Sequence, residues 1–429
     1  MLTFLYRAAW AAARAAAPIL GTGDGKLARS LTGRLRAADA LAQWAAPSRD
    51  TSRPLIWFHA ASVGEGRQAE AVITRLRRQR PEWQLVYTFS SASAEAFAQQ
   101  LDVAVAGYLP ADTPRDTART LDALAPSAII FSATDLWPEL VGQAHQRGVR
   151  VALISAALPP TSSRRGIGAR ALLSDTYRSL DIVGAVDAPD ADGLVQLGVP
   201  RERITITGDT RHDAAATRAA AIDRHAPYLR AIARSDRPVI VAGSTWPADE
   251  AVLLPALAAL HHRTPFALVI APHETDAAHL VKLERSLKDS LGDVKVARLA
   301  QLDAGPWDVC LVDRVGILAE LYAAARVAYV GGGFHKAGLH SVIEPAALGI
   351  PVVFGPRWQT SRDARLLLDQ GGVTSAANEM ELTSAIERYL MDAEAHDRAG
   401  AAARSVVTAG LGAAQRSLEL VLRLVEQLG

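Results

Sequence analysis

Short apolar runs alternate with longer amphipathic stretches along most of the chain from Leu55 onward. Apolar runs of this kind are typical of buried parallel strands, and apolar positions three and four apart are typical of helices. Ala69, Val72, Ile73 and Leu76 form such a helical face after the first run. The predicted strands are Leu55 to His59, Gln84 to Phe89, Ala128 to Phe131, Val149 to Ile154, Asp181 to Val186 and Ile204 to Thr207, followed by Pro238 to Ala242, Phe266 to Ile270, Val294 to Ala297, Val309 to Val312, Val327 to Val330 and Pro351 to Phe354. This alternation predicts an α/β fold in which helices cover parallel sheets.

The two series of strands begin alike, because Arg53-Pro54 leads into the first and Arg237-Pro238 into the second. We therefore predict two Rossmann-like domains, over residues 46–213 and 214–396, with a helical run at Ala214 to Arg234 near their boundary. The segment 397–429 is also helical in pattern and can cross back to the first domain. Ligands of such sheets bind outside the carboxyl ends of the strands, so two domains facing each other would form one central cleft.

Length and composition narrow the class of protein. The chain has 429 residues, more than one core normally supports, and a formal net charge of +1. Without a basic stripe interleaved with aromatic residues, nucleic acid is not expected as the main partner. Cys310 is the single cysteine, which excludes an internal disulfide and fits a reducing compartment. His261-His262 lacks partners at ligand spacing, so no structural zinc is expected.

The amino-terminal segment, residues 1–45, is apolar but repeatedly interrupted by basic residues. Arg7 and Arg14 break the first apolar stretch, so it lacks the ~20 apolar residues that a membrane-spanning helix needs. Further basic residues follow with only Asp24 opposing them, namely Lys26, Arg29, Arg34 and Arg36. We predict an amphipathic segment lying on an anionic membrane surface. The alternatives are a cleaved signal peptide and an ordinary helix packed on the core.

Two loops rich in small residues predict anion binding in the second domain. Gly331 to Gly333 follows a strand and leads toward a helix beginning at Ser341. A loop without side-chain bulk lets backbone N–H groups approach a phosphate, and a helix end adds partial positive charge, so a nucleotide is expected here. Gly243-Ser244-Thr245 forms a second strand-to-helix site of this kind. The alternatives are a tight turn between strand and helix for the first loop and a plain helix cap for the second.

Two glutamates lie at the starts of predicted helices, where each has two interpretations. Glu344 could accept hydrogen bonds from ribose hydroxyls, but with Ser341 it also has the spacing of a capping box. Glu65 could take a proton from a hydroxyl nucleophile, with partial desolvation raising its pKa. Ser62 and Glu65 likewise have capping-box spacing, whereas the flanking Gly64 and Gly66 favour close approach of a ligand.

Two further side chains could contact a nucleotide. Arg211, at the end of the first domain, could bind a phosphate or carboxylate through both arms of its guanidinium group, or could be a solvated linker charge. His273 follows the second strand of the second domain and could contact a base or phosphate, or could simply be packed.

In order along the chain, these segments resemble the Kdo transferases, which move 3-deoxy-D-manno-oct-2-ulosonic acid (Kdo) from its CMP-activated form to a lipid A precursor. The resemblance covers nearly the whole chain and rests on Trp57 to Glu65, Leu136-Trp137-Pro138, Gly208 to Asp213, Gly243 to Thr245, and Val330 to Pro356 with His340 and Glu344-Pro345-Ala346. It implies a two-domain GT-B glycosyltransferase at the cytoplasmic face of the inner membrane, attached peripherally or anchored through its amino terminus. It also implies inversion at the anomeric carbon, with no metal in the chemical step and no cofactor besides the CMP-sugar substrate.

The resemblance also assigns roles to residues. Glu65 matches the general base, Glu344 the carboxylate that binds the CMP ribose, and Gly331, Gly332, Gly333 and Ser244 the phosphate region. The remaining residues implied on the donor side are Arg211, Thr245, His273, Gly316 and His340. On the acceptor side they are Ser62, Gly64, Asp135 and Trp137.

Several positions depart from the family's usual pattern. Ala133-Thr134-Asp135 stands where the family usually has Glu-Thr-Glu, and Ser155-Ala156-Ala157 where it usually has Asn-Ala-Arg. Val315-Gly316-Ile317 replaces Met-Gly-Glu, Thr360 replaces an asparagine, and an arginine near His273 is missing. Two alternatives stay open. One is a nucleotide-sugar 2-epimerase of the same fold type, which would need neither the amino-terminal segment nor Trp137-Pro138. The other is a non-catalytic nucleotide- or lipid-binding relative, which the lost acceptor-side residues favour and the presence of Glu65 disfavours.

Overall fold

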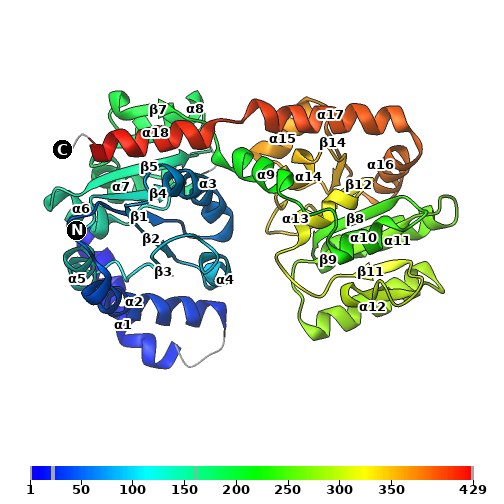
Figure 1. The fold of residues 1–429 in the computed structure, drawn as a ribbon, viewed down its shortest axis with the longest axis horizontal. Helices are drawn as coiled ribbons and strands as arrows, with labels where there is room; N and C mark the ends of the chain where they lie inside the picture. The colour runs from blue at the N-terminus through cyan, green and yellow to red at the C-terminus, as the bar shows by residue number, and fades with distance from the viewer. Residues whose placement is uncertain (1, 21–24, 160–161, 427–429) are drawn as a thin grey trace. The chain divides into compact units, whose positions relative to one another are not determined.

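The computed structural model describes residues 2–20, 25–159 and 162–426, and the chain divides into two compact units. The first unit comprises Met1–Ala214 with Gly410–Gly429, and the second comprises Ala215–Ala409. Each unit contains one seven-stranded sheet flanked by helices (Figure 1). All strand pairs in the described residues are parallel, which confirms the predicted α/β class.

The first sheet has the strand order β3-β2-β1-β4-β5-β6-β7. Its strands are β1 (Leu55–His59), β2 (Gln84–Phe89), β3 (Val105–Tyr108), β4 (Ala128–Ser132), β5 (Arg150–Ala156), β6 (Ile182–Ala185) and β7 (Ile204–Ile206). Its helices are α1 (Leu2–Leu20), α2 (Lys26–Ser48), α3 (Val63–Gln79), α4 (Glu95–Ala98), α5 (Pro114–Leu124), α6 (Pro138–Gln146), α7 (Ile167–Arg178), α8 (Ala188–Leu197) and α18 (Ala413–Glu426). Helix α9 (Thr210–Ala220) continues from this unit into the second.

The second sheet has the strand order β10-β11-β9-β8-β12-β13-β14. Its strands are β8 (Val239–Thr245), β9 (Ala267–Pro272), β10 (Val296–Arg298), β11 (Val309–Leu311), β12 (Val327–Val330), β13 (Val352–Phe354) and β14 (Val373–Ser375). Its helices are α10 (Pro227–Ala233), α11 (Pro247–His261), α12 (Ala277–Leu291), α13 (Leu318–Leu321), α14 (Ile343–Ala347), α15 (Arg362–Asp369), α16 (Glu379–Met391) and α17 (Ala393–Ala409).

Each sheet is buried on both faces, which explains why its strands are continuous apolar runs and do not alternate between apolar and polar residues. In β1, Leu55 and Trp57 pack toward α2, α5 and α6, whereas Ile56 and Phe58 pack toward α3 and α18. The second sheet has the same two layers, with α10, α15 and α17 on one face and α11, α12 and α16 on the other. Continuous apolar strands are therefore required by the layered architecture.

The structure corrects the predictions at the sheet edges and at the long helical segments. Strands β3 and β14 were not predicted, and both are short edge strands. The helical run predicted over 214–234 is interrupted between α9 and α10. The segment predicted over 397–429 is likewise divided: its described part, to residue 426, belongs to two helices with a break at Gly410 to Gly412, where Gly412 has φ +88°, and residues 427–429 lie outside the described residues. Helix α17 belongs to the second unit, and α18 packs on α3 in the first.

The amino-terminal segment is built into the first unit more firmly than predicted. Ala37 and Leu41 of α2 are buried, and the guanidinium group of Arg34 donates to the carbonyl oxygens of Leu109 and Pro110, each at 3.2 Å. Arg34 is therefore an internal residue, and its predicted place on a lipid-facing surface is wrong. The alternative of a helix packed on the core describes α2 well.

Helix α1 is tied to the first unit through polar side chains. Arg7 forms two hydrogen bonds with Glu139, at 2.9 and 3.3 Å, and Arg14 forms one with Asp116 at 3.0 Å. The two arginines therefore have carboxylate partners within the protein. Within residues 2–20, 25–159 and 162–426, no helix is long and apolar enough to cross a membrane.

Candidate active site

Each sheet has one point at which the strand order reverses. This point lies between β1 and β4 in the first sheet and between β8 and β12 in the second. Loops leaving adjacent strands there diverge to opposite faces of the sheet, so the carboxyl ends form a natural binding crevice. Ser62 and Asp135 lie in the loops that follow β1 and β4, while Gly331 immediately follows β12. The sequence-predicted residues thus concentrate at the two positions where an open α/β sheet binds ligands.

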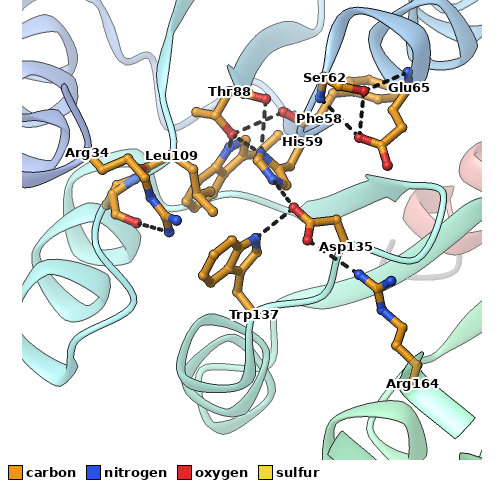
Figure 2. Close-up of polar contacts among 12 residues, drawn as sticks. Arg34, Phe58, His59, Ser62, Glu65, Thr88, Leu109, Asp135, Trp137 and Arg164 are labelled. Carbon is orange, nitrogen blue, oxygen red and sulfur yellow. Dashed lines mark hydrogen bonds and ion pairs between the residues drawn. The ribbon is translucent and has the colours of Figure 1, made fainter. Parts of the chain in front are cut away.

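Glu65 is held in a capping box at the start of α3, as one of the two interpretations predicted. The Ser62 hydroxyl accepts from the Glu65 backbone N–H at 3.4 Å. In return, Glu65 Oε2 accepts from the Ser62 backbone N–H at 3.0 Å and from its hydroxyl at 3.1 Å (Figure 2). These bonds use a single carboxylate oxygen. Glu65 Oε1 makes no hydrogen bond to any residue that the structure describes, so capping leaves it able to accept a proton.

The surroundings of Glu65 raise its pKa. Burial is the largest cause and the negative charge of Asp135 is the next, while the bond from Ser62 and the charge of His59 act in the opposite direction. A carboxyl group with a raised pKa is a stronger base than an ordinary surface glutamate.

Asp135 is the centre of a polar cluster beside Glu65 (Figure 2). Its Oδ2 accepts from Trp137 Nε1 at 3.2 Å and faces His59 Nε2 at 3.4 Å, and its Oδ1 lies 3.6 Å from Arg164 Nη2. Burial acts to raise the pKa of Asp135, but His59, Arg164 and Trp137 together outweigh it and leave the pKa below its usual value. The structure therefore brings together the predicted acceptor-side residues Asp135 and Trp137, and keeps Asp135 ionised.

Sequence reasoning did not single out His59, although it ends a predicted strand. Its side chain is fully buried, and Nδ1 lies 3.0 Å from both the carbonyl and the hydroxyl oxygen of Thr88. Trp57 Nε1 donates to the same hydroxyl at 2.8 Å. A histidine at the carboxyl end of an otherwise apolar strand is the signal that could have identified it. Arg164 gave no comparable signal, because it comes from a distant loop.

Arg34 connects the amino-terminal helices to this cluster. Its guanidinium carbon lies 3.9 Å from the ring centroid of Trp137 and 4.6 Å from that of Trp10 in α1. Burial lowers the pKa of Arg34 to about 10. Cation–π contacts of this kind stabilise a desolvated guanidinium group, so α1 and α2 help to fix the position of Trp137.

Arg211 uses the predicted two-armed geometry, but its partner is a carboxylate of the protein. Its Nε and Nη2 donate to Asp209 Oδ2 at 2.9 and 2.6 Å. Burial acts to raise the pKa of Asp209, but Arg211 and Gln68 outweigh it and lower the pKa to about 2. Gln68 Nε2 also donates to Asp209, at 3.0 Å, so Arg211 is joined to the helix that carries Glu65.

The glycine loop differs from the predicted phosphate cradle. Gly331 N–H donates to Gly243 O at 2.9 Å, and the N–H groups of Gly332 and Phe334 donate to Asp249 at 2.8 and 3.1 Å. Asp249 is fully buried, so a carboxylate of the protein occupies the amides of Gly332 and Phe334. The Gly333 N–H has no acceptor in the described part of the chain, and the place of the three glycines in a phosphate site stays a prediction.

The glycines are needed for packing, as in the alternative of a tight turn. A Cβ at Gly331 would lie 2.1 Å from Ser244 O, and one at Gly333 would lie 2.4 Å from Gly355 N. Gly332 has φ +90°, a conformation that residues with side chains rarely adopt. At the end of β12, the loop therefore packs closely against the backbone at Ser244 and at Gly355.

Ser244 and Thr245 have different surroundings. Thr245 is buried, and its hydroxyl donates to Glu250 at 3.0 Å, so it supports the fold and does not face a ligand as predicted. Burial raises the pKa of Glu250, which also contacts His279 Nε2 at 3.1 Å. Ser244 is half-buried in the left-handed region with φ +54°, a strained conformation common at functional loops.

Glu344 is not part of a capping box, because α14 begins at Ile343 and its cap residue is Val342. Ser341 Oγ instead donates to Glu344 Oε2 at 2.5 Å, and Arg218 lies 4.0 Å from Oε1. The carboxylate remains half-buried. Gly316 lies in an exposed loop with φ +94°, away from close neighbours.

His273 and His340 belong to an aromatic cluster around Trp246. Trp246 stacks on His273 and on His335, in each case with ring centroids 4.3 Å apart, and His273 stacks on His340 at 4.6 Å. Sequence reasoning missed Trp246 and His335, although both adjoin the loops it singled out. Among the residues that the structure describes, no group of His, Cys, Asp or Glu side chains is arranged to hold a metal.

Comparisons with known proteins agree with this arrangement. Residues 33–214 match the family model of the 3-Deoxy-D-manno-octulosonic-acid transferase (kdotransferase). The chain is 30% identical to the 3-deoxy-D-manno-octulosonic acid transferase of Bordetella pertussis over 388 residues, which cover 85% of this chain and 86% of the relative. It is 30% identical to the transferase of the same name from Chlamydophila psittaci over 326 residues, covering 74% and 73%.

The fold also has solved relatives. The UDP-GlcNAc 2-epimerase from Neisseria meningitidis bound to UDP-GlcNAc aligns with a TM-score of 0.62 and 16% identity, covering 86% of this chain and all of the epimerase chain. At that identity the likeness shows the fold alone, and it confirms the GT-B type. The closer sequence relatives decide against the epimerase alternative. The chain belongs to the 3-deoxy-D-manno-octulosonic acid transferase family and is a glycosyltransferase.

Proposed function

We propose that the protein transfers Kdo from CMP-Kdo to a sugar hydroxyl of a lipid A precursor, with inversion at the anomeric carbon. In this reaction the acceptor oxygen forms a bond to the Kdo anomeric carbon, and the bond from that carbon to the CMP phosphate oxygen breaks. The acceptor proton goes to Glu65, and CMP leaves with the bonding electron pair. Because Glu65 accepts the proton and CMP leaves as a phosphate anion, the proposed step requires neither a metal nor a further cofactor.

One observation supports this role most strongly: Glu65 has one oxygen fixed by Ser62 and the other without a partner among the described residues. A base held in this way is oriented without being neutralised. Its raised pKa and its place beside the reversal of strand order fit the same role. Asp135 and Trp137 would then contact the acceptor, and on the second unit Glu344, Ser244, His273 and His340 would contact CMP.

Replacing Ser62 by alanine should move the acid limb of the pH–rate profile to higher pH. The Ser62 hydroxyl bond lowers the pKa of Glu65, so its loss raises that pKa further and leaves less carboxylate at a given pH. The plateau rate at high pH should stay within about 3-fold, since the Ser62 backbone N–H bond remains. The measurement is kcat/KM for Kdo transfer across pH.

Ser62→Thr is the matched control, because it keeps a hydroxyl and should keep the limb in place. Thermal unfolding of both variants checks the cap itself, whose loss costs about 1 kcal/mol. A limb that stays in place or moves to lower pH in Ser62→Ala would contradict the proposed role of Glu65.

We also propose that the first unit binds the cytoplasmic face of the inner membrane peripherally, where lipid A precursors lie. Leu27 at the start of α2 is 86% exposed and Leu5 of α1 is 55% exposed, so both are apolar side chains facing solvent. Replacing both by aspartate should weaken flotation with anionic vesicles about 10-fold or more, since burying one leucine is worth about 1.5–3 kcal/mol. The control is Met380→Asp, an equally exposed position in the second unit. Undiminished flotation of the double variant would refute this contact surface.

A further inference from the structure

The side chain of Trp246 fixes the proton position of His340. Trp246 Nε1 donates to His340 Nε2 at 2.8 Å, and the planes of the two rings are inclined by only 11°. An indole nitrogen can only donate, so His340 Nε2 must accept and cannot carry a proton. The proton of the neutral ring is therefore on Nδ1.

The surroundings of His340 keep the ring neutral. Burial is the largest cause, and with the neighbouring His273 and His335 it lowers the pKa of His340 to about 4. His273 stacks on His340, while His335 lies parallel to Trp246 with an inclination of 10°. The Ala337 backbone N–H donates to His335 Nδ1 at 3.2 Å, which holds the outer ring of the stack. The stacked rings therefore keep Trp246 and His340 in the positions that their hydrogen bond needs.

His340 also lies against the glycine loop. Its backbone N–H donates to Gly331 O at 3.0 Å, and a Cβ at Gly332 would lie 3.1 Å from the ring carbon Cδ2. The amides of Gly331, Gly332 and Phe334 already have acceptors within the protein. By contrast, His340 Nδ1–H has no acceptor in the described part of the chain. His340 Nδ1–H is thus left to donate to a ligand, from a residue that the loop carbonyl of Gly331 holds.

We propose that Trp246 is a positioning residue that holds His340 in the Nδ1–H form, so that Nδ1 donates a hydrogen bond to the phosphate of the CMP-sugar. This rests on the proposed function, since it takes CMP to bind at the glycine loop. It adds a side-chain donor beside a loop in which Asp249 already occupies the amides of Gly332 and Phe334. A phosphate oxygen is an acceptor only, so the tautomer decides whether the bond forms.

Trp246→Phe tests the proposal, because phenylalanine keeps a ring against His273 and His335 but cannot donate. CMP affinity should fall about 10-fold or more, the effect of losing one hydrogen bond to a charged group, while cytidine affinity should not change. The matched control is Trp307→Phe, the same substitution at a buried tryptophan in the second unit outside the cluster. It should leave the affinities for CMP and cytidine unchanged.

A second variant makes the test specific to the tautomer. In His340→Asn, the amide nitrogen can replace Nδ1 and donates without depending on Trp246. Adding Trp246→Phe to His340→Asn should cost no further CMP affinity, whereas the same substitution in the unmodified protein costs about 10-fold or more. Equal losses from Trp246→Phe in both backgrounds would overturn the proposal, as would an equal loss of cytidine affinity.

The tautomer itself can be observed by NMR with ¹⁵N-labelled histidine, using His340→Asn to assign the signals. The unmodified protein should show His340 Nε2 without a proton, and Trp246→Phe should show protonated Nε2. A proton on Nε2 in the unmodified protein would overturn the proposal, as would an unchanged tautomer in the variant. These measurements need no transfer reaction, so they can fail while Kdo transfer is confirmed, or succeed while it is not. Absence of CMP binding to the unmodified protein would remove both the donor assignment and this role of His340.

Discussion

Glu65→Gln should reduce Kdo transfer about 10²- to 10⁴-fold while leaving CMP binding and folding intact. Removal of a general base costs a factor of this size, because the acceptor hydroxyl must then lose its proton without a positioned acceptor. Glutamine can still accept the two bonds from Ser62, so the capping box and the start of α3 are preserved. Transfer is measured as CMP release and extension of a lipid A precursor, with CMP-Kdo made in situ.

The matched control for this prediction is Glu70→Gln on the same helix. Glu70 is paired with Arg67 at 2.8 Å and is three-tenths exposed, so its replacement should alter transfer by less than about 3-fold. If Glu65→Gln retained the rate of the unmodified protein, Glu65 would have no part in the chemistry. If Glu65→Gln also lost CMP binding or unfolded, the loss of transfer could not be assigned to the base.

Asp249→Ala should destabilise the second unit by about 4 kcal/mol or more. Asp249 is fully buried and accepts four hydrogen bonds, from the N–H groups of Trp246, Gly332 and Phe334 and from the Tyr329 hydroxyl. Alanine would leave these donors buried without partners, and each unsatisfied group costs about 1–3 kcal/mol. Chemical denaturation followed by far-ultraviolet circular dichroism measures the loss.

Asp303→Ala is the control for Asp249, because Asp303 forms an exposed ion pair with Arg234. Its loss should change stability by less than about 1 kcal/mol. A change of that small size in Asp249→Ala would show that the glycine loop does not depend on this carboxylate. It would also reopen the prediction that the loop amides are available to a phosphate.

The fold could be predicted from the sequence wherever burial dictated the pattern. Strands such as β1 and β12 are enclosed on both faces, so their apolar runs have the same bounds in the sequence pattern and in the structure. The edge strands β3 and β14 escaped prediction because Gly107 interrupts the first and Val373 is the only apolar residue of the second, so neither has an apolar run. The break between α17 and α18 depends on the left-handed turn at Gly412, which hydropathy does not reveal.

The candidate site was predictable where its residues are close in sequence, as with Ser62 and Glu65. It was not predictable where a distant side chain supplies the partner. The glycine loop has the composition of a phosphate cradle, yet Asp249 on α11 occupies two of its amides. The guanidinium group of Arg211 could bind a phosphate through two nitrogens, yet it already donates to Asp209. Composition shows which groups a loop offers, and only the packed structure shows which of them are already bonded.

The most direct test of the role of Glu65 is kcat/KM for Kdo transfer as a function of pH, in the unmodified protein and in Glu65→Gln. Burial and Asp135 raise the pKa of Glu65, so the unmodified enzyme should lose activity, on acidification, at a pH above the ordinary glutamate range. Glutamine does not titrate, so the residual activity of Glu65→Gln should lack that acid limb. The same limb persisting in the variant would show that another group accepts the proton, and would contradict the account.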